Sequence, residues 1–227
     1  MPGWPRQHFA LLLGLTVVLA IVLRVSLVDA GDGAAARSDH YLPVAAAIGL
    51  THDVPADAAL ATWVNAGIYT IKYAALSAIA PDTSPVDFCA QFLADPESFS
   101  ALAGIAVLIA VAASIILAYR LVAYLIDPVA GVVVAFVIAI HPTAIGFTNG
   151  VDSGAFCLLF LLCGLSIVAR VDWRKVRGVD LAATGLCLGF ALDAIPLAAP
   201  LMAVIIILGF RATPAERRIR LAGQGAL

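Results

Sequence analysis

Long apolar runs constrain the fold of this chain more than any other feature of its sequence. Residues 9–28 and residues 102–126 each contain a single charged side chain, an arginine, and each reaches the roughly 20 residues that a helix needs to cross a bilayer. Lipid offers the backbone no hydrogen-bond partners, so a segment that crosses it must be a helix or part of a closed barrel. Neither run alternates polar and apolar residues as barrel strands do. We therefore expect an all-α membrane protein.

Composition extends this expectation to the whole chain. Of its 227 residues 63% are hydrophobic and 12% are charged, and its mean hydropathy is +1.03, whereas a soluble domain carries about 25% charged residues. We predict a polytopic transmembrane helix bundle of about six spans that forms a single membrane domain, residues 1–227. The predicted apolar segments are residues 9–28, a weaker 59–80, 102–126, 129–140, 153–169 and 179–210, the last divided near Pro196 and Pro200.

Two classes of protein find no support in the sequence. No stripe of basic residues with interleaved aromatic residues predicts nucleic-acid binding. The four cysteines show neither the spacing of a metal site nor a disulfide framework, and we interpret them as small buried hydrophobic residues.

Charged residues set the direction of the predicted spans. Basic residues gather in residues 170–177 and in the polar tail, residues 211–227, and the positive-inside rule assigns both places to the cytoplasmic side. The predicted first loop, residues 29–100, holds nine of the fifteen acidic residues and is assigned to the outside. We therefore predict a multi-pass protein of the plasma (inner) membrane with a cytoplasmic N-terminus and its remaining spans in residues 101–210.

The first apolar run has two interpretations. It could be a signal peptide, because Arg6 precedes it and a short "VDA" follows it. Its length favours an uncleaved anchor, since signal cores are typically about 7 to 15 residues long. Arg24 favours the anchor too, because an arginine near the outer end of a span can snorkel to the interface.

Residues 59–80 do not suit a single crossing, because both of their flanks are expected outside the membrane. Asn65 and Lys72 interrupt this segment, and we predict a juxtamembrane amphipathic helix that lies along the interface. Lys72 is flanked by tyrosines. It either anchors this helix at headgroup level or holds a lipid-linked phosphate as a compact cation.

Two acidic residues at predicted helix starts are candidates for chemistry. Asp39 could cap a helix that starts at His40. It could instead act as a general base toward an acceptor hydroxyl or amine, and anchor a divalent cation if the reaction uses one. Asp152 precedes the predicted helix of residues 153–169 and has the same two interpretations, a cap or a carboxylate that shares a cavity with Asp39.

The order of these features resembles the GT-C superfamily of polyprenyl-phosphate-sugar-dependent membrane glycosyltransferases, which includes protein mannosyltransferases and lipid A aminoarabinose transferases. Arg24 ends the first helix, and "SDHYLPVAAAIGL" resembles the acid, tyrosine and apolar helix that open the first outer loop of that family. "NAGIYTIKYAALSAI" is similar to its juxtamembrane helix, and "SIILAYRLVAYL" to a helix with a tyrosine-arginine ending. "HPTAIGFTNGVDSGAF" resembles a polar loop with an aspartate before a span, and "LAATGLCLGFALDAIPL" a Gly-x-x-x-Gly span.

The resemblance implies transfer of a sugar from a polyprenyl-phosphate carrier to an acceptor at the outer face, with inversion at the anomeric carbon. It implies that Asp39 is the catalytic carboxylate. The residues implied in binding the donor and acceptor are Asp152, His40, Tyr41, Lys72 and Arg24. It also implies that the chain corresponds to the N-terminal membrane core of the family.

One departure from the family keeps a second hypothesis open. Asp193 stands where a lysine commonly ends the Gly-rich span, and its charge would repel a phosphate. The alternative is a non-catalytic membrane subunit or truncated pseudoenzyme that keeps the scaffold and binds a lipid carrier or a partner protein. A small transporter ranks third, because transporters place polar groups near the bilayer midplane and the later spans have almost none there.

Overall fold

The computed structural model describes residues 6–27, 41–51, 59–141, 153–171 and 177–194. Nearly all of these residues are helical, and no strand occurs among them, which confirms the all-α prediction for the described part of the chain. The helices are α1 (Arg6–Leu27), α3 (Ala59–Ile79), α4 (Pro85–Ala94), α5 (Pro96–Leu125), α6 (Pro128–Ile140), α8 (Ser153–Arg170) and α9 (Gly178–Ala194). Residues 41–47 form a further short helix.

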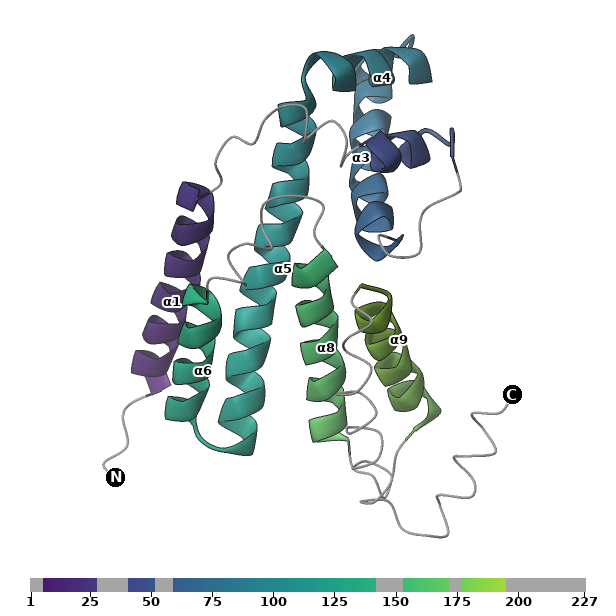
Figure 1. Ribbon diagram of the computed structural model, residues 1–227. Helices are drawn as coiled ribbons and strands as arrows, with labels where there is room; N and C mark the ends of the chain where they lie inside the picture. Colours follow the sequence, from purple (N-terminus) through teal and green to yellow (C-terminus); the bar gives the residue numbers. More distant parts are fainter. Residues whose placement is uncertain (1–5, 28–40, 52–58, 142–152, 172–176, 195–227) are drawn as a thin grey trace.

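Five of the helices pack side by side in a bundle. Their order across the molecule is α1, α6, α5, α8 and α9 (Figure 1). At one end of the bundle a second layer is formed by residues 41–50 and 59–101, which include α3, α4 and the first turns of α5, and we call this layer the cap. α1, α6 and α9 run toward the cap, whereas α5 and α8 run away from it (Figure 1).

Two helices are long and apolar enough to cross a membrane by length and composition. They are the stretch His8–Val25 of α1 and the whole of α5, and three shorter apolar helices, α6, α8 and α9, lie beside them. Only 17% of the α1 stretch is buried, so most of its apolar side chains lie on the surface of the bundle. Large exposed apolar faces mark contact with lipid or with another protein. The number of spans, about six, stays a prediction.

α5 is longer than the bundle and joins it to the cap. Its 30 residues correspond to a length of about 45 Å at 1.5 Å per residue, compared with about 30 Å for a hydrocarbon core. The helix begins at Pro96 rather than at the predicted residue 102, because Asp95 caps it by accepting a hydrogen bond from the Ser98 amide. The first turns of α5 therefore belong to the cap.

α4 was not among the predicted elements. It is a short helix whose start is fixed by a capping box, in which the Ser84 side chain accepts from the Asp87 amide and the Asp87 carboxylate accepts from the Ser84 amide. The Ser84 hydroxyl also donates to the Asp87 carboxylate at 2.7 Å, and this bond, together with the one from the Ser84 amide, lowers the pKa of the exposed Asp87. The predicted first loop thus contains three described helices, which are residues 41–47, α3 and α4, and also the start of α5.

Small residues let the bundle helices approach closely. The core consists of buried side chains from α1, α3, α5, α6, α8 and α9, and many of them are alanines, as is typical of helix pairs that pack in lipid. A Cβ atom added to Gly131 of α6 would lie 2.8 Å from the Tyr119 carbonyl oxygen of α5. A Cβ atom on Gly164 of α8 would lie 2.9 Å from the Leu188 side chain of α9.

In membrane helices a Gly-x-x-x-Gly pair most often marks close packing, and Gly185 and Gly189 form such a pair in α9. A Cβ atom added to Gly185 or Gly189 meets nothing within 4 Å among the described residues. Within the described residues, α9 approaches α8 through Leu188, which packs against Gly164.

We expect Gly131→Ala to destabilise the bundle, because overpacking a tight helix contact costs about 1–3 kcal/mol. The control is Gly104→Ala in α5, where an added Cβ atom meets nothing within 4 Å and alanine should be neutral or stabilising. Thermal unfolding of the purified chain in detergent measures the difference. Equal melting temperatures for the two variants would contradict the close α5–α6 contact.

Candidate functional site

The cap is held together by a cluster of aromatic rings around Phe99. The ring centroids of Tyr69, Phe88 and Phe92 each lie 5.3 Å from that of Phe99 in edge-to-face geometry. Such pairs contribute about 0.5–1.5 kcal/mol beyond their buried area. The Tyr69 hydroxyl donates to the Phe99 carbonyl oxygen at 3.2 Å. The cluster fixes α3 and α4 against the first turns of α5.

Lys72 lies at the edge of this cluster. Its Nζ is 3.4 Å from the centroid of the Phe99 ring and donates to Ser98 Oγ at 3.0 Å. A cation over an aromatic face gains about 0.5–2 kcal/mol. Burial lowers the pKa of Lys72, and the Asp95 carboxylate offsets part of that effect. The ammonium group is therefore held at one place on the cap.

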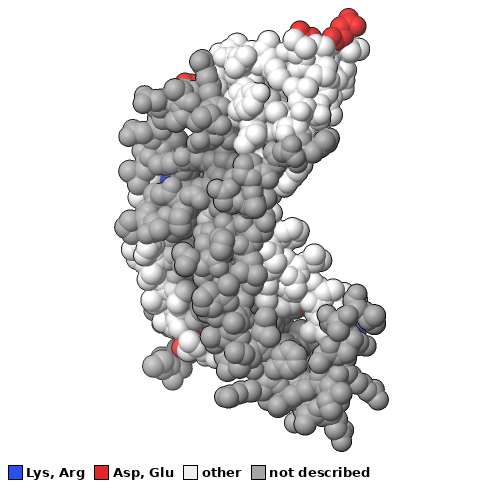
Figure 2. Space-filling model, turned by 45° about the vertical axis from the view of Figure 1, so that its right-hand side comes forward, with Lys and Arg blue, Asp and Glu red and all other residues white. Residues whose placement is uncertain are grey.

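The surface around Lys72 is acidic. Asp82, Asp87, Asp95 and Glu97 are all exposed on the cap, and acidic atoms gather at this end of the molecule (Figure 2). Lys72 is the one basic residue in the described part of the cap. Among the described residues of the cap, Lys72 therefore offers the one positive charge to an approaching anion.

The buried face of α3 carries a polar side chain that makes no hydrogen bond. Asn65 is 0% exposed, and neither its amide nitrogen nor its amide oxygen has a hydrogen-bond partner. Leaving such a group unpaired costs about 1–3 kcal/mol. Thr62 and Tyr69 are buried on the same face.

Arg24 lies at one end of the contact between α1 and α6 and hydrogen-bonds to both helices. The side chain is 0% exposed, and its Nη1 donates to the carbonyl oxygens of Ala20 and Ala139, each at 3.1 Å. Ala139 lies in the last turn of α6, whose carbonyls have no partner within the helix, and a cation there also complements the helix dipole. The snorkelling prediction was wrong, because Arg24 is buried between helices instead of reaching the surface.

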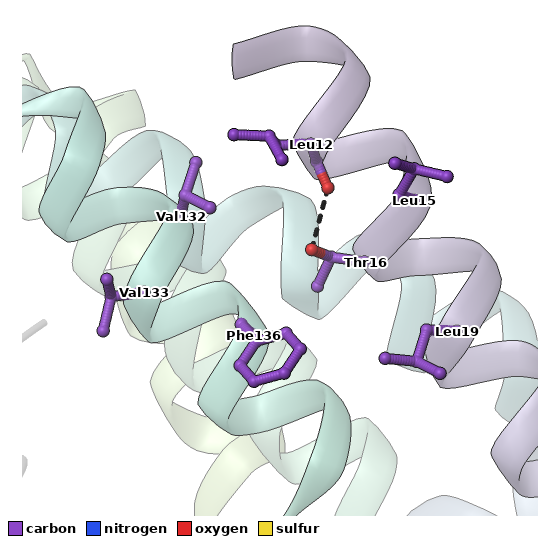
Figure 3. Close-up of a pocket in the computed structure, with 7 residues that line it drawn as sticks. All are labelled: Leu12, Leu15, Thr16, Leu19, Val132, Val133 and Phe136. Atoms are coloured by element: carbon purple, nitrogen blue, oxygen red, sulfur yellow. Dashed lines mark hydrogen bonds between the residues drawn. The ribbon is translucent and has the colours of Figure 1, made fainter. Parts of the chain in front are cut away.

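An open groove runs between α1 and α6 (Figure 3). Its volume is about 320 Å³, and it is lined by Leu12, Leu15, Thr16, Leu19, Val132, Val133 and Phe136. The one hydroxyl among these side chains, that of Thr16, donates to the Leu12 carbonyl oxygen at 2.8 Å. The groove therefore offers apolar surface but no polar group for catalysis.

The predicted site residues divide into two groups. Asp39, His40 and Asp152 lie outside the described residues, so their predicted roles stay predictions. Tyr41 begins the short helix of residues 41–47 and is 59% exposed. A divalent cation also stays a prediction, and the described residues contain no group of three or more His, Cys, Asp or Glu side chains that could hold a metal.

Lys72 and Arg24, which were both predicted to meet the donor phosphate, have different partners in the structure. Lys72 binds Ser98 and Phe99 in the cap, whereas Arg24 binds backbone carbonyls of α1 and α6. Each cation therefore has contacts within the fold, and its predicted role in binding the donor phosphate stays a prediction.

In the sequence Asn65 was interpreted only as an interruption of the apolar segment 59–80. A signal was available, because residues 62, 65, 69 and 72 follow the spacing of one helix face. Polar side chains at that spacing in an otherwise apolar helix indicate a shared polar stripe.

Comparison of the chain with models of protein families, with curated proteins and with solved structures finds no match.

We expect Arg24→Met to weaken the α1–α6 contact by about 2 kcal/mol, because the Ala139 carbonyl oxygen loses its buried donor. The matched control is Arg170→Met, which changes an exposed arginine in the last turn of α8. Hydrogen exchange of the last turn of α6, together with thermal unfolding in detergent, measures the effect. The assignment of Arg24 fails if the two variants behave alike.

Proposed function

We propose that the chain is a multi-pass protein of the plasma (inner) membrane whose cap lies on the extracytoplasmic side. The charges at the two ends of the bundle support this orientation. Exposed carboxylates crowd the cap, while the exposed Arg170 and Arg177 lie at the far end, where α8 ends and α9 begins. The positive-inside rule assigns the basic end to the cytoplasm.

In this orientation, we propose that the protein transfers a sugar from a polyprenyl-phosphate donor to an acceptor at the outer face. The observation that carries the proposal is Lys72, the one described cation of an acidic cap, held at the end of an apolar helix bundle. A donor with an isoprenoid tail and a phosphate headgroup needs both an apolar surface and a fixed cation at its boundary. The order of sequence features shared with the GT-C glycosyltransferases supports the same activity.

The proposed chemistry is an inverting displacement. Asp39 takes the proton of the acceptor hydroxyl, the acceptor oxygen attacks the anomeric carbon, and the bond from that carbon to the phosphate oxygen breaks. Polyprenyl phosphate leaves with the bonding electrons, and Lys72 stabilises its negative charge. Asp152, His40 and Tyr41 are assigned to the cavity that receives the acceptor.

Two described neighbours support the placement of the carboxylates. Tyr41, two residues after Asp39, begins a helix of the cap, and Ser153, directly after Asp152, begins α8 at the cap end of the bundle. Chain connectivity therefore favours one shared side of the membrane for both acids.

The test is transfer of radiolabelled sugar from polyprenyl-phosphate donors by the full chain in reconstituted membranes. We expect Asp39→Asn to lower turnover by at least about a hundredfold, the usual scale of a lost general base. Asp82→Asn is the control, since Asp82 is an exposed cap acid outside the proposed cavity. If Asp39→Asn and Asp82→Asn both retain wild-type turnover, Asp39 is not the base.

A specific observation also favours the second candidate, a non-catalytic membrane subunit that binds a lipid carrier or a partner protein. Lys72 already has two partners within the cap, Ser98 and Phe99, so its charge could serve the fold alone. We then expect purification in mild detergent to recover a stoichiometric membrane protein partner, with no sugar transfer by the isolated chain. A monodisperse monomer that transfers sugar would exclude this candidate.

A further inference from the structure

The polar stripe of α3 extends from the bundle into the cap. Leu60 and Val64, near the start of α3, pack against the bundle core, and Tyr69 belongs to the aromatic cluster of the cap. Asn65 lies between them on the buried side of the helix. The amide is therefore at the level where the apolar bundle meets the cap.

Asn65 differs from the other polar side chains of α3. The Thr70 hydroxyl donates to the Ala66 carbonyl oxygen at 2.8 Å, the Tyr69 hydroxyl donates to the Phe99 carbonyl oxygen, and Lys72 binds Ser98. Asn65 presents a buried donor and a buried acceptor without a partner for either. Buried polar groups in proteins are almost always paired, and an exception calls for a specific cause.

The distance from Asn65 to Lys72 along the helix suits a sugar phosphate. The two residues are two helical turns apart on one face, a rise of about 10 Å at 1.5 Å per residue. A phosphate joined to one sugar ring, with a hydrogen bond at each end, has about this extent. An amide that both donates and accepts is complementary to a sugar hydroxyl, which does the same.

We propose that Asn65 binds a hydroxyl of the sugar on a polyprenyl-phosphate carrier while Lys72 holds the carrier phosphate. The proposal deepens the proposed function and rests on it. Because Asn65 is fully buried, binding requires α3 to shift against the ends of α8 and α9, which it contacts. Asn65 is then a specificity-determining residue that distinguishes a sugar-linked carrier from the bare phosphate.

The experiment titrates the full chain in nanodiscs with bare polyprenyl phosphate and with polyprenyl-phosphate-linked mannose, glucose and arabinose, and measures melting temperatures and Kd. For the wild type we expect every carrier to bind and at least one sugar-linked carrier to bind more tightly than the bare phosphate. Asn65→Leu should bind that carrier about tenfold more weakly, since one hydrogen-bonded pair is lost. Its affinity for bare polyprenyl phosphate should stay unchanged.

The ligand-free protein provides a second readout. Asn65→Leu removes both unpaired atoms at similar side-chain size, so its melting temperature without carrier should rise above that of the wild type. Ser166→Ala is the matched control, because the Ser166 hydroxyl in α8 is also buried without a partner. That variant should keep the wild-type preference for the sugar-linked carrier.

The outcomes separate the two proposals. If the wild type binds carriers and prefers a sugar-linked one, but Asn65→Leu and Asn65→Ala both keep that preference, Asn65 does not read the sugar and the proposed function stands. The same conclusion follows if the wild type binds all the carriers equally. If the wild type binds no carrier at all, the proposed function is overturned together with the role of Asn65. Asn65→Ala serves as the readout if Asn65→Leu does not fold.

Discussion

The unbroken run of α5 is the constraint on which the rest of the structure depends. One helix supplies the middle of the bundle core, through Val107, Val111 and Ile115, and also the centre of the cap, through Phe99. Within residues 59–141, α5 is the one segment through which the chain passes from the cap into the bundle. Asp95 and Pro96 make this possible, because they start α5 well before its apolar run begins. Because α5 runs through both layers, it fixes the orientation of the cap relative to the bundle.

The second constraint is that polar side chains in apolar helices need hydrogen-bond partners. Hydroxyl groups of α1, α3 and α5 donate to the carbonyl four residues earlier, as Thr16, Ser77 and Ser114 do, so they need no partner from another helix. A guanidinium has more donors than that one carbonyl can satisfy, as Arg24 shows with its bond to the Ala20 carbonyl, and an amide needs a donor partner as well as an acceptor. Arg24 reaches across to α6 for a carbonyl, and Asn65 finds none. The side chains that the helix cannot satisfy by itself are the ones that point to contacts between elements or to a ligand.

The difference between contacts within one helix and contacts between helices explains which features the sequence could predict. Helical segments depend on local apolar runs, so the predicted segments at residues 129–140 and 153–169 agree with α6 and α8 to within one residue at each end. The start of α5 and the whole of α4 escaped prediction because they depend on caps at Asp95 and Ser84 rather than on apolarity. Contacts between distant helices were not predictable: no local pattern brings Lys72 to Phe99, or selects Gly131 rather than Gly185 for close packing.

The contacts of Lys72 determine how readily its ammonium group could bind an anion instead of stabilising the cap. The bond to Ser98 is replaceable, because the Ser98 hydroxyl also donates to the Asp95 carbonyl oxygen at 3.1 Å and keeps that partner if the lysine moves. The contact with the Phe99 ring is not lost when an anion approaches from the opposite side of the ammonium group. A charge-assisted hydrogen bond to phosphate is about twice as strong as one between neutral groups. Moving Nζ from Ser98 to a phosphate would therefore cost the cap little and would gain a charged pair, so the present contacts of Lys72 are compatible with a site that binds an anion.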